Sequence, residues 1–248
     1  MVETSAPSAR RPRRPRGPTL AEALIFDVDG TLAETEALHR RAFNETFAEW
    51  GLDWHWSRTD YTRLLKTTGG KERIACYMAE TGVTDADIPA LHRAKNDRYT
   101  ALMAQGAMTL RPGVLEVIAQ ARGAGLRLAV ATTTSRPNVE ALSAACFGQP
   151  AGEVFEVIAA GDEVAAKKPA PDVYLLALDR LGLPGPACVA IEDSRNGVLS
   201  ALGAKIPVVV TPSAYTEGED FTGAHAVLSD LTQFDLTELT RGRLPTCL

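Results

Sequence analysis

The sequence predicts an α/β protein, with a Rossmann-like parallel sheet core and an inserted α-helical cap domain. From residue 108 onward, short apolar runs alternate with helical segments, which is typical of a parallel sheet covered on both faces. Before that point, one apolar run at residues 21–28 is followed by residues 36–106, which contain no convincing strand. One strand, a helical insertion and then the remaining strands indicate a core interrupted by a cap.

The N-terminal elements are expected in this order. The run "AEALIFDV" (residues 21–28) reads as a short buried strand that ends in a pair of aspartates. Two later helices are expected in "GKERIACYMAETG" (70–82) and "DIPALHRAKNDRYTALMAQG" (87–106). Between the strand and these helices, one face of a further helix is formed by Leu38, Ala42, Phe43, Thr46 and Phe47. We expect Trp50, Trp54 and Trp56 to pack between the cap helices.

The second half of the chain alternates regularly. Strands are expected in "LRLAVATTT" (126–134), "VFEVIAAG" (154–161), "CVAIED" (188–193) and "IPVVVTP" (206–212). The helices that separate or precede them are expected in "RPGVLEVIAQARGAG" (111–125), "RPNVEALSAACFG" (136–148), "APDVYLLALDRLG" (170–182) and "NGVLSALGAK" (196–205). The domain prediction is therefore a core of residues 19–35 and 108–248 and a helical cap of residues 36–107.

Residues 1–18 differ from the rest of the chain. They carry a net charge of +4 and include "SAPSARRPRRPRGP", so we expect a disordered basic tail. The whole chain has a net charge of −5, which leaves −9 on the body. The tail is either a solvated extension or a contact for nucleic acid or another acidic surface. The acidic body does not suggest an enzyme that acts on nucleic acid.

Composition excludes several classes of protein. With 45% hydrophobic and 23% charged residues, the 248-residue chain resembles an ordinary globular protein. No stretch approaches the roughly 20 apolar residues that cross a bilayer, so no membrane contact is expected. The four cysteines have no CxxC spacing, which fits a reducing cytoplasm rather than a disulfide framework or zinc site.

Polar side chains gather where the expected strands end. Asp27 and Asp29 follow the first strand, Thr132 to Ser135 the second, and Glu192 and Asp193 the strand in "CVAIED", while Lys168 lies in a loop. Ligands of open parallel sheets bind at the carboxyl ends of the strands. Carboxylates crowded there repel each other unless a cation holds them together. The D-x-D pattern is not an EF-hand, because Leu32 and Leu38 stand where that loop needs Gly and Glu.

Four motifs occur in order: "DVDGT", "TTTS", "KKPAPD" and "IEDS". Together they resemble the haloacid dehalogenase superfamily of aspartate-nucleophile phosphotransferases, from about Leu20 to the C-terminus. The resemblance implies Asp27 as nucleophile and Asp29 as general acid and base. It implies Thr132, Thr133 and Lys168 at the phosphate, with Lys168 chosen over Lys167 because it directly precedes Pro169. The implied cofactor is Mg²⁺, bound by Asp27, the Asp29 carbonyl, Asp193 and, directly or through water, Glu192.

A narrower resemblance is carried by "FDVDGTLAETEALHRRAFN", "TTGGKERI" and "VATTTSRPNVEAL". These segments are similar to the CbbY-type branch, whose members remove a phosphate from xylulose-1,5-bisphosphate, a misfire product that inhibits Rubisco. The branch implies Glu36 and Tyr61 at the substrate. Arg136 departs from the usual apolar residue and either adds an anion contact or is exposed. The substrate-binding residues expected in full are Glu36, His39, Tyr61, Gly69, Gly70, Lys71, Arg73, Thr133, Ser135 and Arg136.

The function expected from these patterns is a Mg²⁺-dependent sugar-bisphosphate phosphatase that forms an aspartyl phosphate. The alternative is a phosphosugar mutase of the same superfamily, which returns phosphate to a second hydroxyl. A catalytically idle binding module fits poorly, because Asp27, Asp29, Lys168 and Asp193 are all present. We expect a cytoplasmic monomer whose partner is a small-molecule phosphosugar, with no nucleic acid.

Overall fold

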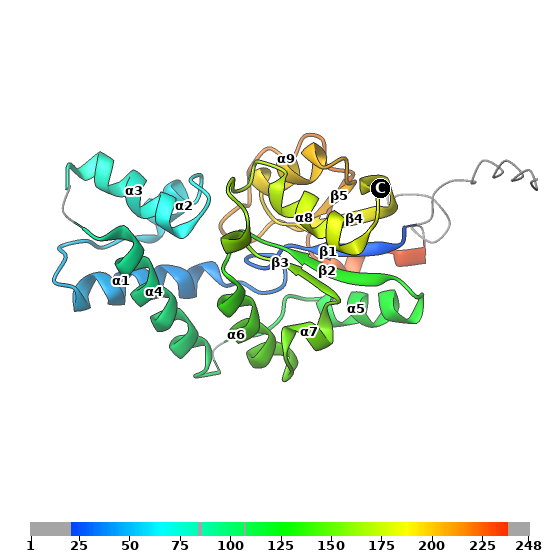
Figure 1. Ribbon diagram of the computed structural model, residues 1–248, viewed down its shortest axis with the longest axis horizontal. Helices are drawn as coiled ribbons and strands as arrows, with labels where there is room; N and C mark the ends of the chain where they lie inside the picture. The colour runs from blue at the N-terminus through cyan, green and yellow to red at the C-terminus, as the bar shows by residue number, and fades with distance from the viewer. Residues whose placement is uncertain (1–20, 84–85, 107, 238–248) are drawn as a thin grey trace, which may run out of the picture.

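The structure is a computed structural model that describes residues 21–83, 86–106 and 108–237. The predicted disordered basic tail, residues 1–18, lies outside the described residues. Figure 1 shows a sheet with helices on both sides and a separate group of helices beside it. The α/β class, the parallel sheet and the helical cap predicted from the sequence are confirmed. The domain boundaries at residues 36 and 107 stay a prediction.

Within the described residues the sheet has six parallel strands in the order β3-β2-β1-β4-β5-β6. Phe26 at the end of β1 pairs with Val130 and with Ile191, so the neighbouring strands end at nearly the same level. This register brings the polar residues after β1, β2 and β4 to one edge of the sheet. The strands are β1 (Ala23–Phe26), β2 (Arg127–Ala131), β3 (Val157–Ala159), β4 (Cys188–Glu192), β5 (Val208–Val210) and β6 (Ala226–Val227).

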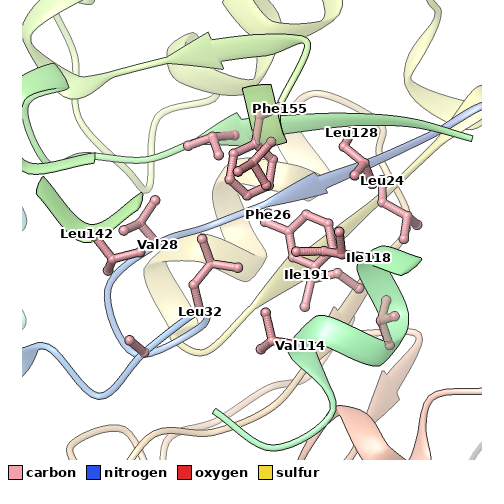
Figure 2. Packing of buried hydrophobic residues seen from close by; sticks show 14 of the residues in the cluster. Leu24, Phe26, Val28, Leu32, Val114, Ile118, Leu128, Leu142, Phe155 and Ile191 are labelled. Atoms are coloured by element: carbon pink, nitrogen blue, oxygen red, sulfur yellow. The ribbon is translucent and has the colours of Figure 1, made fainter. Parts of the chain in front are cut away.

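Alternating side chains of β1 build two separate cores. Leu24 and Phe26 belong to the buried cluster on one face, where Phe26 lies 6.1 Å from the ring of Phe155 (Figure 2). Ala23 and Ile25 belong to the cluster on the other face. The first face is covered by α5 (Val114–Gly123), α6 (Arg136–Phe147) and α7 (Ala151–Val154), and the second by α8 (Asp172–Leu181) and α9 (Arg195–Gly203). Both faces are apolar, as a central parallel strand requires.

The cap helices, α1 to α4, have a core of their own. It is rich in aromatic residues and includes Trp54 and Trp56, whereas Trp50 is 44% exposed. The prediction that the tryptophans pack between cap helices is therefore confirmed for two of the three. The cap helices are α1 (Glu36–Glu49), α2 (Arg58–Leu64), α3 (Gly70–Thr81) and α4 (Ile88–Met103).

Short 3₁₀ turns complete the described structure at η1 (Gly161–Glu163), η2 (Gly185–Ala187) and η3 (Leu231–Gln233). Among the described residues, none forms a helix long and apolar enough to span a membrane.

Candidate active site

The turn after β1 carries the first pair of aspartates. The N–H of Asp27 donates to the carbonyl of Ile191 on β4 at 2.9 Å, which anchors Asp27 beside that strand. The chain then turns at Gly30, whose φ is +81°. A Cβ at Gly30 would collide with the carboxylate of Asp193 and with Ser213. Glycine is therefore required both by the backbone conformation and by the close approach of Asp193.

Three carboxylates meet at this edge, and we call Asp27, Glu192 and Asp193 the acid cluster. One oxygen of each lies within 4.8 Å of the others, and all three side chains are buried. Burial raises the pKa of Asp27 to about 8; Lys168 opposes this effect and Glu192 adds to it. Burial, followed by Asp27 and Glu192, also raises the pKa of Asp193 well above its usual range. The carboxylates thus lack enough positive charge to ionise freely together.

Lys168 is the cation that the chain itself supplies to the acid cluster. Its Nζ donates to Asp27 Oδ1 at 2.6 Å, to Glu192 Oε1 at 2.6 Å and to the carbonyl of Ala131 at 2.9 Å. An ammonium group has three N–H donors, so these three bonds use all of them. Lys167, in contrast, donates to backbone carbonyls of its own loop. Of the two adjacent lysines, Lys168 is the one at the acid cluster.

The acid cluster fits a divalent cation. One ammonium group balances only one of its three carboxylates. Glu192 Oε2 is fully buried and has no hydrogen-bond partner among the described residues. An unpaired buried carboxylate oxygen is costly, and three oxygens at this spacing are ligands that a hard cation accepts.

Asp29 points into a different network from Asp27. Its Oδ1 accepts a bond from Thr35 Oγ1 at 2.6 Å and lies 3.1 Å from His39 Nε2. Lys95 Nζ in turn lies 2.7 Å from His39 Nδ1. Burial alone would raise the pKa of Asp29, but His39, Thr35 and Lys95 outweigh it and lower the pKa to about 2. Burial lowers the pKa of Lys95 to about 7.

A second chain of hydrogen bonds fixes the cap side. Tyr61 donates to Glu36 Oε2 at 2.7 Å, and Arg73 Nη1 donates to the Tyr61 oxygen at 2.9 Å. The Arg73 guanidinium also lies over the Tyr61 ring, 5.0 Å from its centroid. Arg73 is 8% exposed, so only part of it is accessible to a ligand. Tyr61 therefore holds both Glu36 and Arg73 in place.

A cavity of about 560 Å³ lies between the cap and the carboxyl edge of the sheet. Two acids of the acid cluster line it, as does Lys71 at the start of α3, where the Glu72 carboxylate packs against Gly69. The cavity brings together twelve of the predicted site residues: Asp27, Asp29, Glu36, His39, Gly69, Gly70, Lys71, Arg73, Thr133, Ser135, Lys168 and Asp193.

Four predicted site residues are not among the described residues that line this cavity. Glu192 and Tyr61 are completely buried behind it. Thr132 is 1% exposed, and its hydroxyl accepts a bond from the N–H of Thr134 at 3.2 Å. Of the two alternatives for Arg136, the structure agrees with exposure and corrects the substrate contact: its Nε donates to Glu140 one turn along α6 at 3.2 Å, and the side chain is 46% exposed. This i, i+4 pair keeps Arg136 on the outer face of the helix.

Sequence reasoning missed several residues that line the cavity. His92, Lys95 and Asn96 all come from α4, and Asn196 comes from the first turn of α9. The signal was present in the α4 sequence, where these polar residues recur at the spacing of one helix face. Lys95 was not recognised as a site residue, because a lysine in a helix is usually exposed to solvent.

The model of the haloacid dehalogenase-like hydrolase family matches residues 21–205 of this chain. The chain belongs to this family. It is also 61% identical over 213 residues to Protein CbbY of Rhodobacter capsulatus, covering 85% of this chain and 94% of that protein. It is therefore a phosphatase of the CbbY branch, a phosphoric monoester hydrolase.

Solved structures of CbbY have the same fold. CbbY from Rhodobacter sphaeroides in complex with phosphate is 56% identical and has a TM-score of 0.84, covering 86% of this chain and 96% of its own. A variant of that protein, in complex with xylulose-1,5-bisphosphate, matches with the same identity, coverage and TM-score.

Proposed function

We propose that this phosphatase is Mg²⁺-dependent and converts xylulose-1,5-bisphosphate to xylulose 5-phosphate. The observation that carries the proposal is one cavity lined both by the reactive carboxylate Asp27 and by Lys71 and Arg73 of the cap. A bisphosphate needs cationic groups at two places, and this lining offers both. The complex of the 56% identical Rhodobacter sphaeroides protein with xylulose-1,5-bisphosphate supports the same substrate here.

The acid cluster would hold the Mg²⁺, with the Asp29 carbonyl as a further oxygen ligand. When bound, the cation neutralises the carboxylates and the phosphate, so that an anionic substrate can approach Asp27. Lys168 aligns Asp27 through their 2.6 Å bond and favours its ionised form, so it opposes the effect of burial.

Asp27 is the nucleophile. Its carboxylate oxygen forms a bond to phosphorus as the bond from phosphorus to the sugar oxygen breaks, which leaves an aspartyl phosphate. Thr133 and Ser135 line the cavity beside it and hold the phosphate oxygens, and the buried Thr132 hydroxyl supports this loop. Water then attacks the aspartyl phosphate and releases inorganic phosphate.

Asp29 moves the protons. It donates to the leaving sugar oxygen and later takes a proton from the attacking water. Both steps need its pKa to rise from about 2 toward the working pH. Loss of the bonds from Thr35 and His39 when the substrate is bound would have this effect, because those bonds stabilise the ionised form.

The physiological role follows from the substrate. We infer that the enzyme removes xylulose-1,5-bisphosphate as a misfire inhibitor and so protects Rubisco, a role implied by membership of the CbbY branch. A cytoplasmic monomer without a nucleic-acid partner remains part of the same proposal.

The proposal is tested by following the reaction of the full chain with xylulose-1,5-bisphosphate by ³¹P NMR, with Mg²⁺ and with EDTA. We expect inorganic phosphate and xylulose 5-phosphate in Mg²⁺ only. The alternative, a phosphosugar mutase, is tested with a hexose 1-phosphate and a catalytic amount of the matching hexose 1,6-bisphosphate. Conversion of the 1-phosphate to the 6-phosphate faster than phosphate release would favour the mutase, and full hydrolysis in EDTA would refute the Mg²⁺ requirement.

A further inference from the structure

Tyr174 contacts the acid cluster but does not line the cavity. It belongs to α8, which covers the sheet face shared with α9 (Figure 1), and its side chain is 0% exposed. Its hydroxyl donates to Glu192 Oε1 at 2.6 Å. Tyr174 is not among the described residues that line the cavity, so it acts on the site only through its neighbours.

The two oxygens of Glu192 are used unequally. Oε1 accepts two bonds of 2.6 Å, one from Tyr174 and one from Lys168. A carboxylate oxygen offers two lone-pair sites, so these donors occupy both. Oε2 is left without a hydrogen-bond partner in the described part of the chain, although it is buried. This division leaves one oxygen of Glu192 for a cation.

Lys168 alone cannot hold the Glu192 carboxylate with Oε1 bonded and Oε2 free. Its three N–H donors are shared among Asp27, Ala131 and Glu192, so it gives Glu192 a single bond. A single bond at Oε1 fixes the orientation of the carboxylate less firmly than two bonds do. The Tyr174 hydroxyl adds the second fixed point, and its ring also lies 5.2 Å from the Lys168 ammonium.

The first turn of α9 closes the remaining side. A Cβ at Gly197 would collide with the Glu192 carboxylate, and its nearest atom would be Oε2, so the helix backbone lies against the oxygen that has no hydrogen-bond partner. Glu192 is thus confined between Gly197, Lys168 and Tyr174. Of these three contacts, the Tyr174 hydroxyl can be removed without changing charge or backbone.

We propose that Tyr174 is a positioning residue for the cation of the acid cluster, because its hydroxyl fixes Glu192 with Oε2 left free as a ligand. This inference rests on the proposed Mg²⁺ site. Groups that hydrogen-bond to metal ligands typically change metal affinity about 10- to 100-fold when they are removed. The ligand itself remains in Tyr174→Phe, so the lower part of this range applies.

The test measures Mn²⁺ binding to the full chain by electron paramagnetic resonance, in the absence of substrate, with Mg²⁺ as competitor. Tyr174→Phe is expected to weaken binding about ten-fold. The Mg²⁺ concentration that gives half-maximal turnover should rise by a similar factor, while saturating Mg²⁺ restores turnover. The KM for the bisphosphate should stay unchanged, which a general loss of structure would not produce. Tyr77→Phe, in the cap, is the matched control and should bind Mn²⁺ like the wild type.

A double-mutant cycle separates action through Glu192 from any other effect. In a Glu192→Gln background, Tyr174→Phe should cause no further loss of Mn²⁺ affinity, because the oxygen that it positions is already changed. Additive losses would overturn the inference, as would wild-type affinity in Tyr174→Phe. Absence of Mn²⁺ binding by the wild type would instead overturn the cation site, and this inference with it.

Discussion

At the scale of single residues, the buried acid cluster lowers the folding stability of the metal-free protein at neutral pH. Asp27 keeps its proton in the folded state up to a pKa of about 8, whereas an unfolded aspartate loses it near its ordinary value of 3.8. Between these values the folded state binds more protons than the unfolded state. The stability of the metal-free protein should therefore fall as pH rises through this window.

The variant Asp27→Asn should lose this contribution, since an amide does not titrate. In EDTA, raising the pH from 5 to 8 should lower the Tm of the wild type more than that of Asp27→Asn. Thermal melts of both proteins at the two pH values measure the difference. Parallel pH profiles would mean that Asp27 is already ionised in the folded state.

The second residue-scale prediction concerns Lys71, which is exposed at the start of α3 and lines the cavity. A charge-assisted bond to the distal phosphate contributes about 1.5–3 kcal/mol. Lys71→Ala should therefore lower kcat/KM for xylulose-1,5-bisphosphate roughly 10- to 100-fold and change little for a small phosphate ester. Arg73→Ala is a less clean variant, because it also releases Tyr61 and Glu36.

Steady-state kinetics on both substrates measure this selectivity. Lys66→Ala is the matched control, since Lys66 precedes the same segment and is not among the described residues that line the cavity. Equal losses on both substrates in Lys71→Ala would assign Lys71 to the fold rather than to the distal phosphate.

At the scale of elements, the loop after β5 joins the cap to the acid cluster. On the cap side, Arg58 of α2 donates to the carbonyl of Ala214 at 3.1 Å and lies 5.2 Å from the ring centroid of Tyr215. On the core side, Thr216 Oγ1 donates to Asp193 Oδ2 at 3.3 Å. Packing of α2 against this loop therefore helps to position Asp193, a proposed metal ligand.

Arg58→Ala should remove this docking without touching the cavity. The lost hydrogen bond and cation–π contact are worth about 1 kcal/mol in an exposed position. If docking of α2 is needed in the transition state, this loss lowers kcat/KM for the bisphosphate roughly five-fold. Arg63→Ala is the control, because Arg63 lies on the same helix but pairs with Glu80 within the cap at 2.7 Å. Equal kinetics for the two variants would show that the Arg58 contact does not affect turnover.

Elements differed in how well the sequence predicted them. The strands that end at Phe26 and at Glu192 were clear, because a buried parallel strand is a nearly continuous apolar run. The helix α2 and the strand β6 were missed: α2 has seven residues, and β6 has two and exposes Val227 by 43%. Elements this short carry too few positions for a period to be recognised.

At the scale of the whole molecule, the core part of the site was predictable and its cap part only partly so. Asp27 and Asp193 follow from strand ends that converge in any sheet of this topology, whereas Lys168 was chosen over Lys167 through the resemblance to the family motif. The bonds from Lys95 to His39 and from Tyr174 to Glu192 depend on how helices pack over the sheet. The polar face of α4 can be recognised in the sequence, but which side chains it meets across the packed helices cannot, so these pairs emerged only from the structure.

A whole-molecule prediction concerns residues 1–17. The residues assigned to catalysis and substrate binding all lie after residue 26, within the described part of the chain. Removal of residues 1–17 should therefore leave kcat and KM for the bisphosphate within about two-fold of the wild-type values, since no step of the proposed mechanism uses these residues. A large loss of turnover would mean that the tail takes part in the reaction.

The central claim is that a sugar bisphosphate transfers its phosphate to Asp27. Its most direct test is an acid quench of the full chain during turnover of xylulose-1,5-bisphosphate carrying a labelled 1-phosphate, followed by peptide mapping. We expect the label on the peptide that contains Asp27 in the wild type, and no labelled peptide in Asp27→Asn. Label on another residue, or phosphate release at the wild-type rate by Asp27→Asn, would contradict the account.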